Sequence, residues 1–537
     1  MKRKIGFVFF IAALGAVFLS GCGNKSPAAA AAPAPAASIA PGQAALPLVD
    51  KPVTLTMWMP LGQLDPAAGI TDGNDMLSWQ TIEEKTGIRV NWIHPPAGQD
   101  QENFNLMISS GDYPDLIVAG TYAGGMDKAI ADGVYLRLNE LIDSYAPNYK
   151  ELRNRTPELT RDTITDMGNI GAFYSINTPV QGPWYGMAVR QDWLDDLGLS
   201  APVTYDDWYA MLKAFKEKKG ASAPLWIPNR GGDMFSVFSA GYGVTTPATG
   251  VDGSFFHVSG KVKYSPLETG YREYVTMLAK WYGEGLIDRD FYTRNDYLVP
   301  DTLGNGGKSG AFPDIYVMLP LHSLFSGDPS MKVVAVPAPV KKAGDQLHIR
   351  QYNFERGNYY ASVTTACKDP VLAVRWLDYL CGDEGSLIMG YGVEGDTFEY
   401  VNGKPQPTAK IINNPDGLSA SAARQKYAGL QPCGKYYWER ELTGAAPSAL
   451  DAISTIWPSN ADGDYCMPYA TMTDEEGNEF SRIMGDVDTY AREMTVKFII
   501  GAEPLDKYDD FVRTLKSMGA ENAVALKQAA LDRYYTR

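Results

Sequence analysis

The chain has few of the side-chain groupings that catalysis or metal binding requires. Its four histidines stand apart from one another, and the sequence has no HExxH, CxxC or GxSxG motif. It therefore gives no support for a zinc site or a serine hydrolase. Gly306 to Ser309 end like a P-loop, but Thr302 stands where the first glycine is needed. The 63 acidic residues could always supply the carboxylate pair of a glycosidase, so composition does not exclude one.

Aromatic and polar side chains in loops have a clearer potential role. The chain has 32 Tyr and 11 Trp, whose rings can stack on the apolar faces of sugar rings while polar side chains bind the hydroxyls. In open α/β sheets, ligands lie beyond the carboxyl ends of the strands. Loops that follow the expected strands therefore supply most of the candidates. The candidate ligand-binding residues are Tyr122, Trp184, Tyr185, Arg190, Trp226, Asn229, Arg230, Asp314, Tyr316, Glu394 and Trp457.

Alternating strands and helices are predicted to position these residues. Strands are expected at residues 53–59, 88–93 and 115–119, and helices between them at 76–86 and 104–110. This order predicts a mainly parallel sheet with helices on both faces. The fold class is therefore α/β, with more helix than strand. Later helices are expected at residues 192–197, 205–218, 270–284, 371–381, 486–498 and 508–518.

The N-terminus has the pattern of an export signal. Basic residues 2–4 precede an apolar run over residues 5–18, which is too short to span a membrane comfortably. Small residues follow, so residues 1–21 are predicted to be a signal peptide. Residues 22–49 consist largely of Ala and Pro, which predicts an extended linker without a continuous helix.

Leu19-Ser20-Gly21-Cys22 resembles the lipobox of bacterial lipoproteins. The resemblance implies that Cys22 is diacylated and becomes the first residue of the exported protein. No other long apolar run is present, so this lipid would be the only membrane attachment. The expected location is the outer face of the bacterial cytoplasmic membrane.

Five further segments, in the same order, resemble the extracellular solute-binding proteins of ABC importers (family 1), in particular their long oligosaccharide-binding lipoprotein branch. The likeness runs from about residue 51 to the C-terminus. The family patterns that it matches are SGD-x-PD, R-x-DWL-x-x-LGL followed by P-x-TYDEW, YG-I-EG and a pattern near the C-terminus. The segments are Ser110–Leu116, Arg190–Leu199 with Thr204–Trp208, Tyr391–Gly395, Lys497–Gly501 with Leu505–Tyr508, and Ala530–Tyr534.

The resemblance implies a type II periplasmic-binding-protein-like fold with two lobes, a hinge and a ligand cleft between the lobes. We expect lobe one at residues 50–175 plus 356–388, and lobe two at 176–355 plus 389–537. The implied function is capture of an extracellular oligosaccharide and its delivery to ABC permease subunits, by a monomer and without catalysis. A binding protein for a peptide or another polar solute, an anchored glycan-degrading enzyme and a sensor for a membrane kinase remain alternatives.

No cofactor is expected. Some members of the branch carry a calcium loop, D-x-N-x-N-G-x-x-DE, after the helix that corresponds to residues 205–218. Here residues 217–224 lack oxygen ligands at alternate positions, so a calcium site is doubtful. The acidic stretch at residues 474–478 is also wrongly spaced and is predicted to be a solvated loop.

Bulk properties limit the remaining possibilities. The 537 residues are too many for one core, which predicts several domains. The formal net charge of −15 disfavours nucleic acid and anionic lipid as partners. Export would permit up to two disulfides among Cys367, Cys381, Cys433 and Cys466, but the sequence does not pair them.

Overall fold

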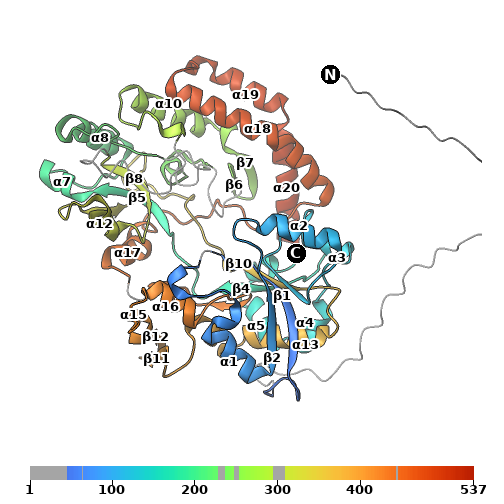
Figure 1. Ribbon diagram of the computed structural model, residues 1–537. Helices are drawn as coiled ribbons and strands as arrows, with labels where there is room; N and C mark the ends of the chain where they lie inside the picture. Colours follow the sequence, from blue (N-terminus) through green and yellow to red (C-terminus); the bar gives the residue numbers. More distant parts are fainter. Residues whose placement is uncertain (1–44, 63, 228–235, 247–252, 294–308, 443–444) are drawn as a thin grey trace, which may run out of the picture. The chain divides into compact units, whose positions relative to one another are not determined.

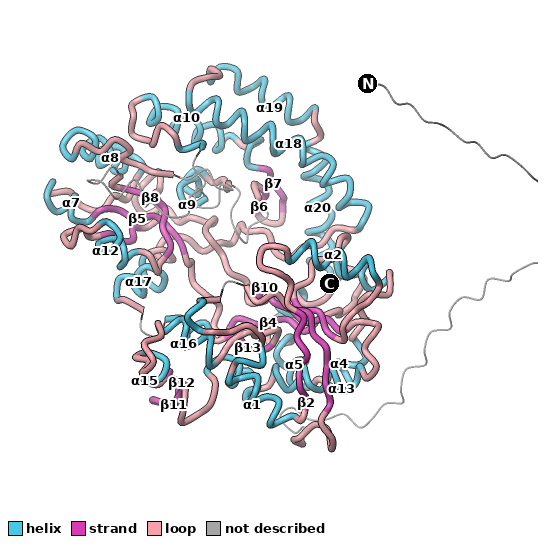
Figure 2. The backbone as a smooth tube through the Cα atoms, viewed as in Figure 1, coloured by secondary structure: helices cyan, strands magenta, loops and turns pink. Residues whose placement is uncertain are grey.

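The structure, a computed structural model, describes residues 45–62, 64–227, 236–246, 253–293, 309–442 and 445–537. Contacts divide the chain into a short unit, residues 1–37, and a unit of residues 38–537 that contains every described residue. Everything below concerns the second unit. Its described strands gather in two main groups, one around β1, β4 and β10 and one around β5 and β8 (Figure 2). The mixture of helices and strands confirms the predicted α/β class.

The first group is a mixed sheet of six described strands in the order β13–β4–β10–β3–β1–β2. β1 lies parallel to β2 and β3, as predicted, and β13 lies parallel to β4. β10 is antiparallel to both β3 and β4. The sheet is therefore less parallel than expected, because the chain returns to it from the second group in the opposite direction. The strands are β1 Val53–Trp58, β2 Ile88–Ile93, β3 Leu116–Val118, β4 Phe173–Asn177, β10 Arg356–Val363 and β13 Gly434–Tyr436.

Helices cover this sheet and share its apolar core. α1 ends at Thr86 and is capped by Gly87, whose left-handed φ of 74° a glycine adopts without strain. Trp79 of α1 packs edge-on against Trp92 of β2, with ring centroids 4.8 Å apart, and also contacts Trp376 of α13 at 5.9 Å. The helices are α1 Leu77–Thr86, α2 Asp100–Ser110, α3 Gly125–Ala131, α4 Asn139–Tyr145, α5 Pro147–Arg153, α6 Pro157–Asp162, α13 Pro370–Cys381 and α14 Asp383–Tyr391.

A second, separate core surrounds the antiparallel strands β8–β5–β9. Trp208 and Phe215 of α8 and Tyr274 of α10 are among its fully buried side chains. Helices α10, α18 and α19 lie side by side, and α20 packs on α18 (Figure 1). The elements are β5 Tyr185–Arg190, β8 Ala311–Ile315, β9 Val333–Val336, the hairpin β6 Phe255–Val258 with β7 Lys261–Tyr264, α7 Gln191–Leu197, α8 Tyr205–Lys219, α9 Ser236–Ser239, α10 Thr269–Gly283, α12 His322–Ser326, α18 Asp474–Ile500, α19 Tyr508–Ser517 and α20 Ala520–Thr536.

The acidic stretch at residues 474–478 is helical, so its prediction as a solvated loop was wrong. It forms the first turn of α18, where Thr473 accepts a hydrogen bond from the Glu476 amide and Glu476 accepts one from the Thr473 amide. This reciprocal arrangement is a capping box. Acidic side chains in a first turn also interact favourably with the helix dipole, so the same residues that suggest a charged loop stabilise a helix start.

The segment after α14 returns to the first sheet. β13 pairs with β4, and Gln425 of α16 accepts a hydrogen bond of 2.7 Å from the Asp65 amide. The predicted division gave residues 389–537 to lobe two, whereas these pairings tie residues up to about 436 to the first sheet. We therefore propose that lobe one also includes residues 389–436. Smaller elements here are the hairpin β11 Phe398–Val401 with β12 Lys404–Pro407, α15 Ala409–Ile412 and α16 Ala420–Tyr427, and α17 Pro447–Asp451 follows.

None of the helices within the described residues is long and apolar enough to cross a membrane.

Asp378 of α13 is a buried carboxyl that couples folding to pH. It accepts hydrogen bonds from the Tyr149 amide at 2.8 Å and from Asn148 Nδ2 at 2.7 Å. Burial, the largest influence, outweighs these bonds and raises its pKa to about 6. Because the folded-state pKa lies above the unfolded value, the group's stabilising contribution is complete at low pH and is lost as pH rises through about 6.

We predict that Asp378→Asn reduces this pH dependence. A rise of the Asp378 pKa from its ordinary value to about 6 corresponds to at most about 3 kcal/mol, so the wild-type chain should lose up to that much unfolding free energy relative to the variant between pH 4 and pH 7. Urea unfolding of both proteins at each pH measures the difference. A difference between the two proteins that stays constant over this range would contradict the prediction.

Candidate functional site

Three crossover segments connect the two cores, and backbone hydrogen bonds join them. Residues 178–184 lead from β4 to β5, residues 350–355 lead into β10, and residues 437–442 follow β13. The Asn177 amide donates to Glu355 O at 2.8 Å, and the Thr178 amide donates to Tyr436 O at 2.9 Å. The three crossover segments thus lie next to one another at the boundary between the cores, which is the arrangement of a hinge.

Side-chain amides strengthen the same junction. Asn353 Nδ2 donates to Gly182 O at 3.0 Å and to Gln181 O at 3.2 Å. The Trp184 amide donates to Gln351 Oε1 at 2.9 Å, and Trp184 O accepts from the Tyr316 amide at 3.1 Å. The first two crossovers are therefore fixed to each other and to the carboxyl end of β8.

A cavity of about 540 Å³ lies among these crossovers. Its volume falls within the range of pockets that bind small molecules. Trp438 and Tyr352 provide aromatic surface, and amide, guanidinium and carboxylate groups provide both donors and acceptors. The lining residues with these groups are Gln181, Arg350, Tyr352, Asn353, Trp438 and Glu439.

An aromatic contact links the carboxyl end of β8 to the third crossover. Tyr316 packs edge-on against Trp438, with ring centroids 6.0 Å apart. Burial, with a smaller effect of Glu441, raises the pKa of Tyr316 to about 12, so its hydroxyl stays protonated and can donate a hydrogen bond. Arg440 is buried and lies over the Tyr436 ring at 4.8 Å, next to Glu441.

A second aromatic group lies on the crossover into β10. Phe354 contacts Tyr352 and Tyr469, with ring centroids 5.1 and 4.6 Å away. The Arg356 guanidinium lies 3.5 Å from the centre of the Tyr469 ring and 4.6 Å from that of Tyr174, and its Nη1 donates to Asp162 O. This arginine therefore ties lobe one to the segment that precedes α18.

Two predicted site residues, Trp184 and Tyr316, are half-buried and lie at the crossovers. Tyr122 is half-buried in the loop after β3, where its hydroxyl donates to Asp132 Oδ2 at 2.6 Å. That hydrogen bond is the main reason why the pKa of Tyr122 rises to about 12. Glu394 is exposed next to the β11–β12 hairpin. The assignment of these residues to a ligand site stays a prediction.

Other predicted site residues take part in packing. Tyr185, Trp226 and Trp457 are at most 4% exposed, and Trp457 Nε1 donates to Met187 O. The remaining two are buried polar residues with local partners. Arg190 forms a two-bond ion pair with Asp192 and lies over the Trp193 ring, and the Asp314 carboxylate bonds to His322 Nε2 at 2.6 Å.

Three of the sequence-based assignments, Cys22, Asn229 and Arg230, lie outside the described residues.

Sequence reasoning did not select most of the cavity residues. Gln181, Arg350, Tyr352 and Asn353 have no motif and follow no predicted strand. A usable signal was present, however, because the expected lobe boundaries at residues 175/176 and 355/356 fall next to them. Residues that flank a lobe boundary are natural candidates for a site between lobes.

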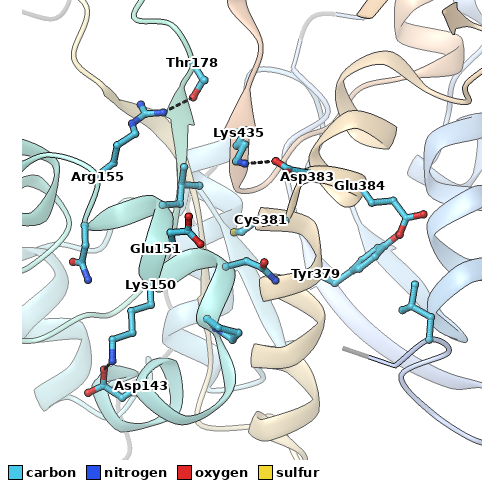
Figure 3. Close-up of a pocket in the computed structure, with 16 residues that line it drawn as sticks. Asp143, Lys150, Glu151, Arg155, Thr178, Tyr379, Cys381, Asp383, Glu384 and Lys435 are labelled. Carbon is cyan, nitrogen blue, oxygen red and sulfur yellow. Dashed lines mark hydrogen bonds and ion pairs between the residues drawn. The ribbon is translucent and has the colours of Figure 1, made fainter. Parts of the chain in front are cut away.

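A larger cavity, of about 1180 Å³, lies on the side of lobe one next to α5, α13 and α14 (Figure 3). Its charged side chains largely neutralise one another. Lys150 pairs with Asp143, Lys435 with Asp383, and the Tyr379 hydroxyl donates to Glu384. With Tyr379 as the one aromatic ring among its lining residues, this cavity is less suited to sugar stacking than the one at the crossovers.

His348, Asp462 and Asp464 form the one described group with spacing suited to a metal ion. One ligand atom from each lies within 4.8 Å of the others, and His348 Nδ1 is already 2.9 Å from Asp462 Oδ2. The group is partly exposed, and the His348–Asp462 contact is satisfied without an ion.

Comparison with known proteins finds relatives that match most of the chain. The family model described as bacterial extracellular solute-binding protein matches residues 80–386. The fructooligosaccharide ABC transporter substrate-binding protein FusA of Streptococcus pneumoniae is 25% identical, over 89% of this chain and 90% of that protein. Lipoprotein LipO of Bacillus subtilis is 23% identical, over 82% and 86% of the two chains.

Solved structures of solute-binding proteins also match most of the chain. The alginate-binding protein AlgQ2, in a structure without calcium ion, matches with a TM-score of 0.67 and 26% identity, and the match covers 90% of this chain and 99% of that one. An extracellular solute-binding protein from Bifidobacterium longum subsp. infantis has a TM-score of 0.73 at 18% identity, covering 90% and 98%. At 18% identity, the Bifidobacterium protein shows the fold alone. Together the two structures confirm the two-lobe fold.

We predict that Arg356→Lys destabilises the chain by about 1–3 kcal/mol, because an ammonium group cannot reproduce a guanidinium stacked between two rings and bonded to a carbonyl. Denaturant unfolding measures the loss. Arg482→Lys is the matched control, since Arg482 is 70% exposed and forms its ion pair with Glu479 one turn away. Equal stability of the two variants would contradict the structural role given to Arg356.

Proposed function

Because the chain belongs to the bacterial extracellular solute-binding proteins, we propose that it captures an oligosaccharide outside the cell and delivers it to the permease subunits of an ABC importer. The observation that carries the proposal is the crossover cavity. It lies where two cores meet, and it combines the rings of Tyr352 and Trp438 with the polar groups of Gln181, Arg350, Asn353 and Glu439. Flat rings and planar polar groups are the chemistry that sugar recognition needs.

The relatives support the class of ligand. The named substrates of FusA and AlgQ2 are fructooligosaccharide and alginate, which are both carbohydrates. The first is neutral and the second acidic, so the relatives do not fix the charge of the ligand. We propose that the chain binds its ligand as a monomer and does not cleave it, with the two lobes closing about the hinge.

The first test is calorimetric titration of the protein with neutral fructooligosaccharides, neutral glucans, uronic-acid oligosaccharides and short peptides. One carbohydrate class should bind, and chromatography of the recovered ligand should show no shorter product. Binding of peptides alone would replace the carbohydrate assignment, and release of shorter sugars would replace the binding role with an enzymatic one.

Trp438→Ala should weaken binding of the identified sugar about 10- to 30-fold, or about 1.4–2 kcal/mol, because it removes the largest aromatic surface of the cavity. Trp438→Phe should retain part of the affinity, which separates loss of stacking from misfolding. Tyr400→Ala is the control, since Tyr400 is exposed on the β11–β12 hairpin. Full affinity in Trp438→Ala would remove this cavity from the binding site.

We also propose that Cys22 carries the lipid that anchors the exported protein. The support is the Leu19-Ser20-Gly21-Cys22 sequence and the similarity to a protein named lipoprotein LipO. The predicted linker ends earlier than residue 49, because Leu48 is buried in the first core and its amide donates to Thr86 O. The residues between Cys22 and Leu48 would then separate the folded unit from the membrane.

Cys22→Ala should abolish incorporation of labelled palmitate and move the protein from the detergent phase to the aqueous phase on Triton X-114 partition. Cys367→Ser should keep the label, because Cys367 is buried in the folded unit. A wild-type protein that incorporates no label would show that the anchor is absent.

A further inference from the structure

Two buried cysteines from distant parts of the sequence are in contact. Cys381 is the last residue of α13, and Cys433 directly precedes β13. Their Sγ atoms lie 3.8 Å apart, and both side chains are 0% exposed. A disulfide bond is about 2.05 Å long, so the two sulfur atoms need to approach by roughly 1.8 Å for a bond to form.

The backbone at the start of β13 lies in close contact with the backbone at the end of α13. Gly434 has a φ of 87°, and a Cβ atom there would lie 2.5 Å from Leu380 O and 3.1 Å from Cys381 Cα. The glycine therefore permits the start of β13 to lie directly against the end of α13. Ser386 holds the same junction, since its hydroxyl donates to Leu380 O and accepts from the Lys435 amide.

The other two described cysteines have different partners. Cys466 Sγ contacts Arg350 O at 3.6 Å, on the crossover into β10. Cys367 belongs to the first core but lies next to Asp115. They provide internal controls, since the geometry pairs only Cys381 with Cys433 among the described cysteines.

We propose that Cys381 and Cys433 form a disulfide in the exported protein, by thiol–disulfide exchange with a protein or low-molecular-weight disulfide outside the cytoplasmic membrane. One thiol loses its proton and attacks the oxidant disulfide, which releases one thiol and leaves a mixed disulfide. The second thiolate displaces the remaining half, so the chain loses two protons and two electrons and the oxidant becomes two thiols. An extracellular location supplies the oxidising conditions that persistent disulfides need.

The bond forms while the chain folds. Burial raises the pKa of the Cys381 thiol well above its ordinary value, so the reactive thiolate is scarce once the core has closed. After formation, the bond ties the start of β13 covalently to the end of α13 within lobe one. Trp438 and Glu439 of the crossover cavity follow β13 within three residues, so the bond fixes one end of the third crossover.

Peptide mapping tests the proposal directly. Cells that export the full-length protein are quenched in denaturant with N-ethylmaleimide, and the purified protein is digested with trypsin without reduction. Arg375, Lys410, Arg424 and Lys426 place the two cysteines on separate tryptic peptides. In a second arm, the reduced and unfolded protein is refolded in a glutathione redox buffer before the same treatment.

We expect a Cys381–Cys433 linked peptide in both arms, with Cys367 and Cys466 modified by the maleimide. Cys466→Ser should keep the linked peptide, and Cys433→Ser should leave all three remaining described cysteines modified. Maleimide on both Cys381 and Cys433 of the wild-type protein in either arm overturns the proposal. A linkage of either residue to Cys367 or Cys466 overturns it as well.

Discussion

Three passes of one chain between two separately packed cores are held in register by backbone hydrogen bonds, and the rest of the molecule depends on this junction. The bonds from the Asn177 and Thr178 amides to Glu355 O and Tyr436 O join all three passes. These residues are half-buried, and a shift of one pass would separate backbone groups that now have partners, so the three passes restrain one another. A junction of this kind allows rotation of the lobes while it keeps the crossover side chains together.

The position of the crossover cavity depends on the same junction. Most of its lining residues lie on the crossovers, and Ile453, Ser454 and Pro458 complete the wall, so the aromatic and polar groups of distant segments meet there without an extra domain. Arg356, stacked on Tyr174 and Tyr469, and Tyr534 of α20, whose hydroxyl donates to Asp162, add contacts between the lobes. Under the proposed function, ligand binding and lobe movement would be coupled through these few side chains.

Local sequence patterns predicted local structure well. The strands expected at residues 53–59 and 88–93 and the helix expected at 205–218 match β1, β2 and α8 to within one residue at each end, because such elements depend on neighbours in the sequence. Within the first sheet, β10 pairs with β3 and β13 pairs with β4. Each pairing joins segments hundreds of residues apart, and no local pattern encodes it. Periodicity therefore predicted the class of fold but not the full sheet order.

The candidate site was harder to predict because one kind of side chain serves two purposes. Tyr185, Trp226 and Trp457 follow or precede the expected strands, yet their rings fill cores. Tyr352 and Trp438 have the same chemistry and line the crossover cavity, although Trp438 also packs in a core cluster with Trp226 and Trp457. Asp314 likewise has the composition of a ligand contact but forms a buried pair with His322. Composition identifies such residues, and only the three-dimensional path of the chain separates the two roles.

Hydrogen–deuterium exchange with and without the bound oligosaccharide tests the central claim most directly. The account predicts that saturation slows amide exchange in residues 178–184, 350–355 and 437–442, which line or border the crossover cavity, and leaves α5 unchanged. Protection concentrated around α5 and α14, next to the larger cavity of lobe one, with no change at the crossovers, would contradict it.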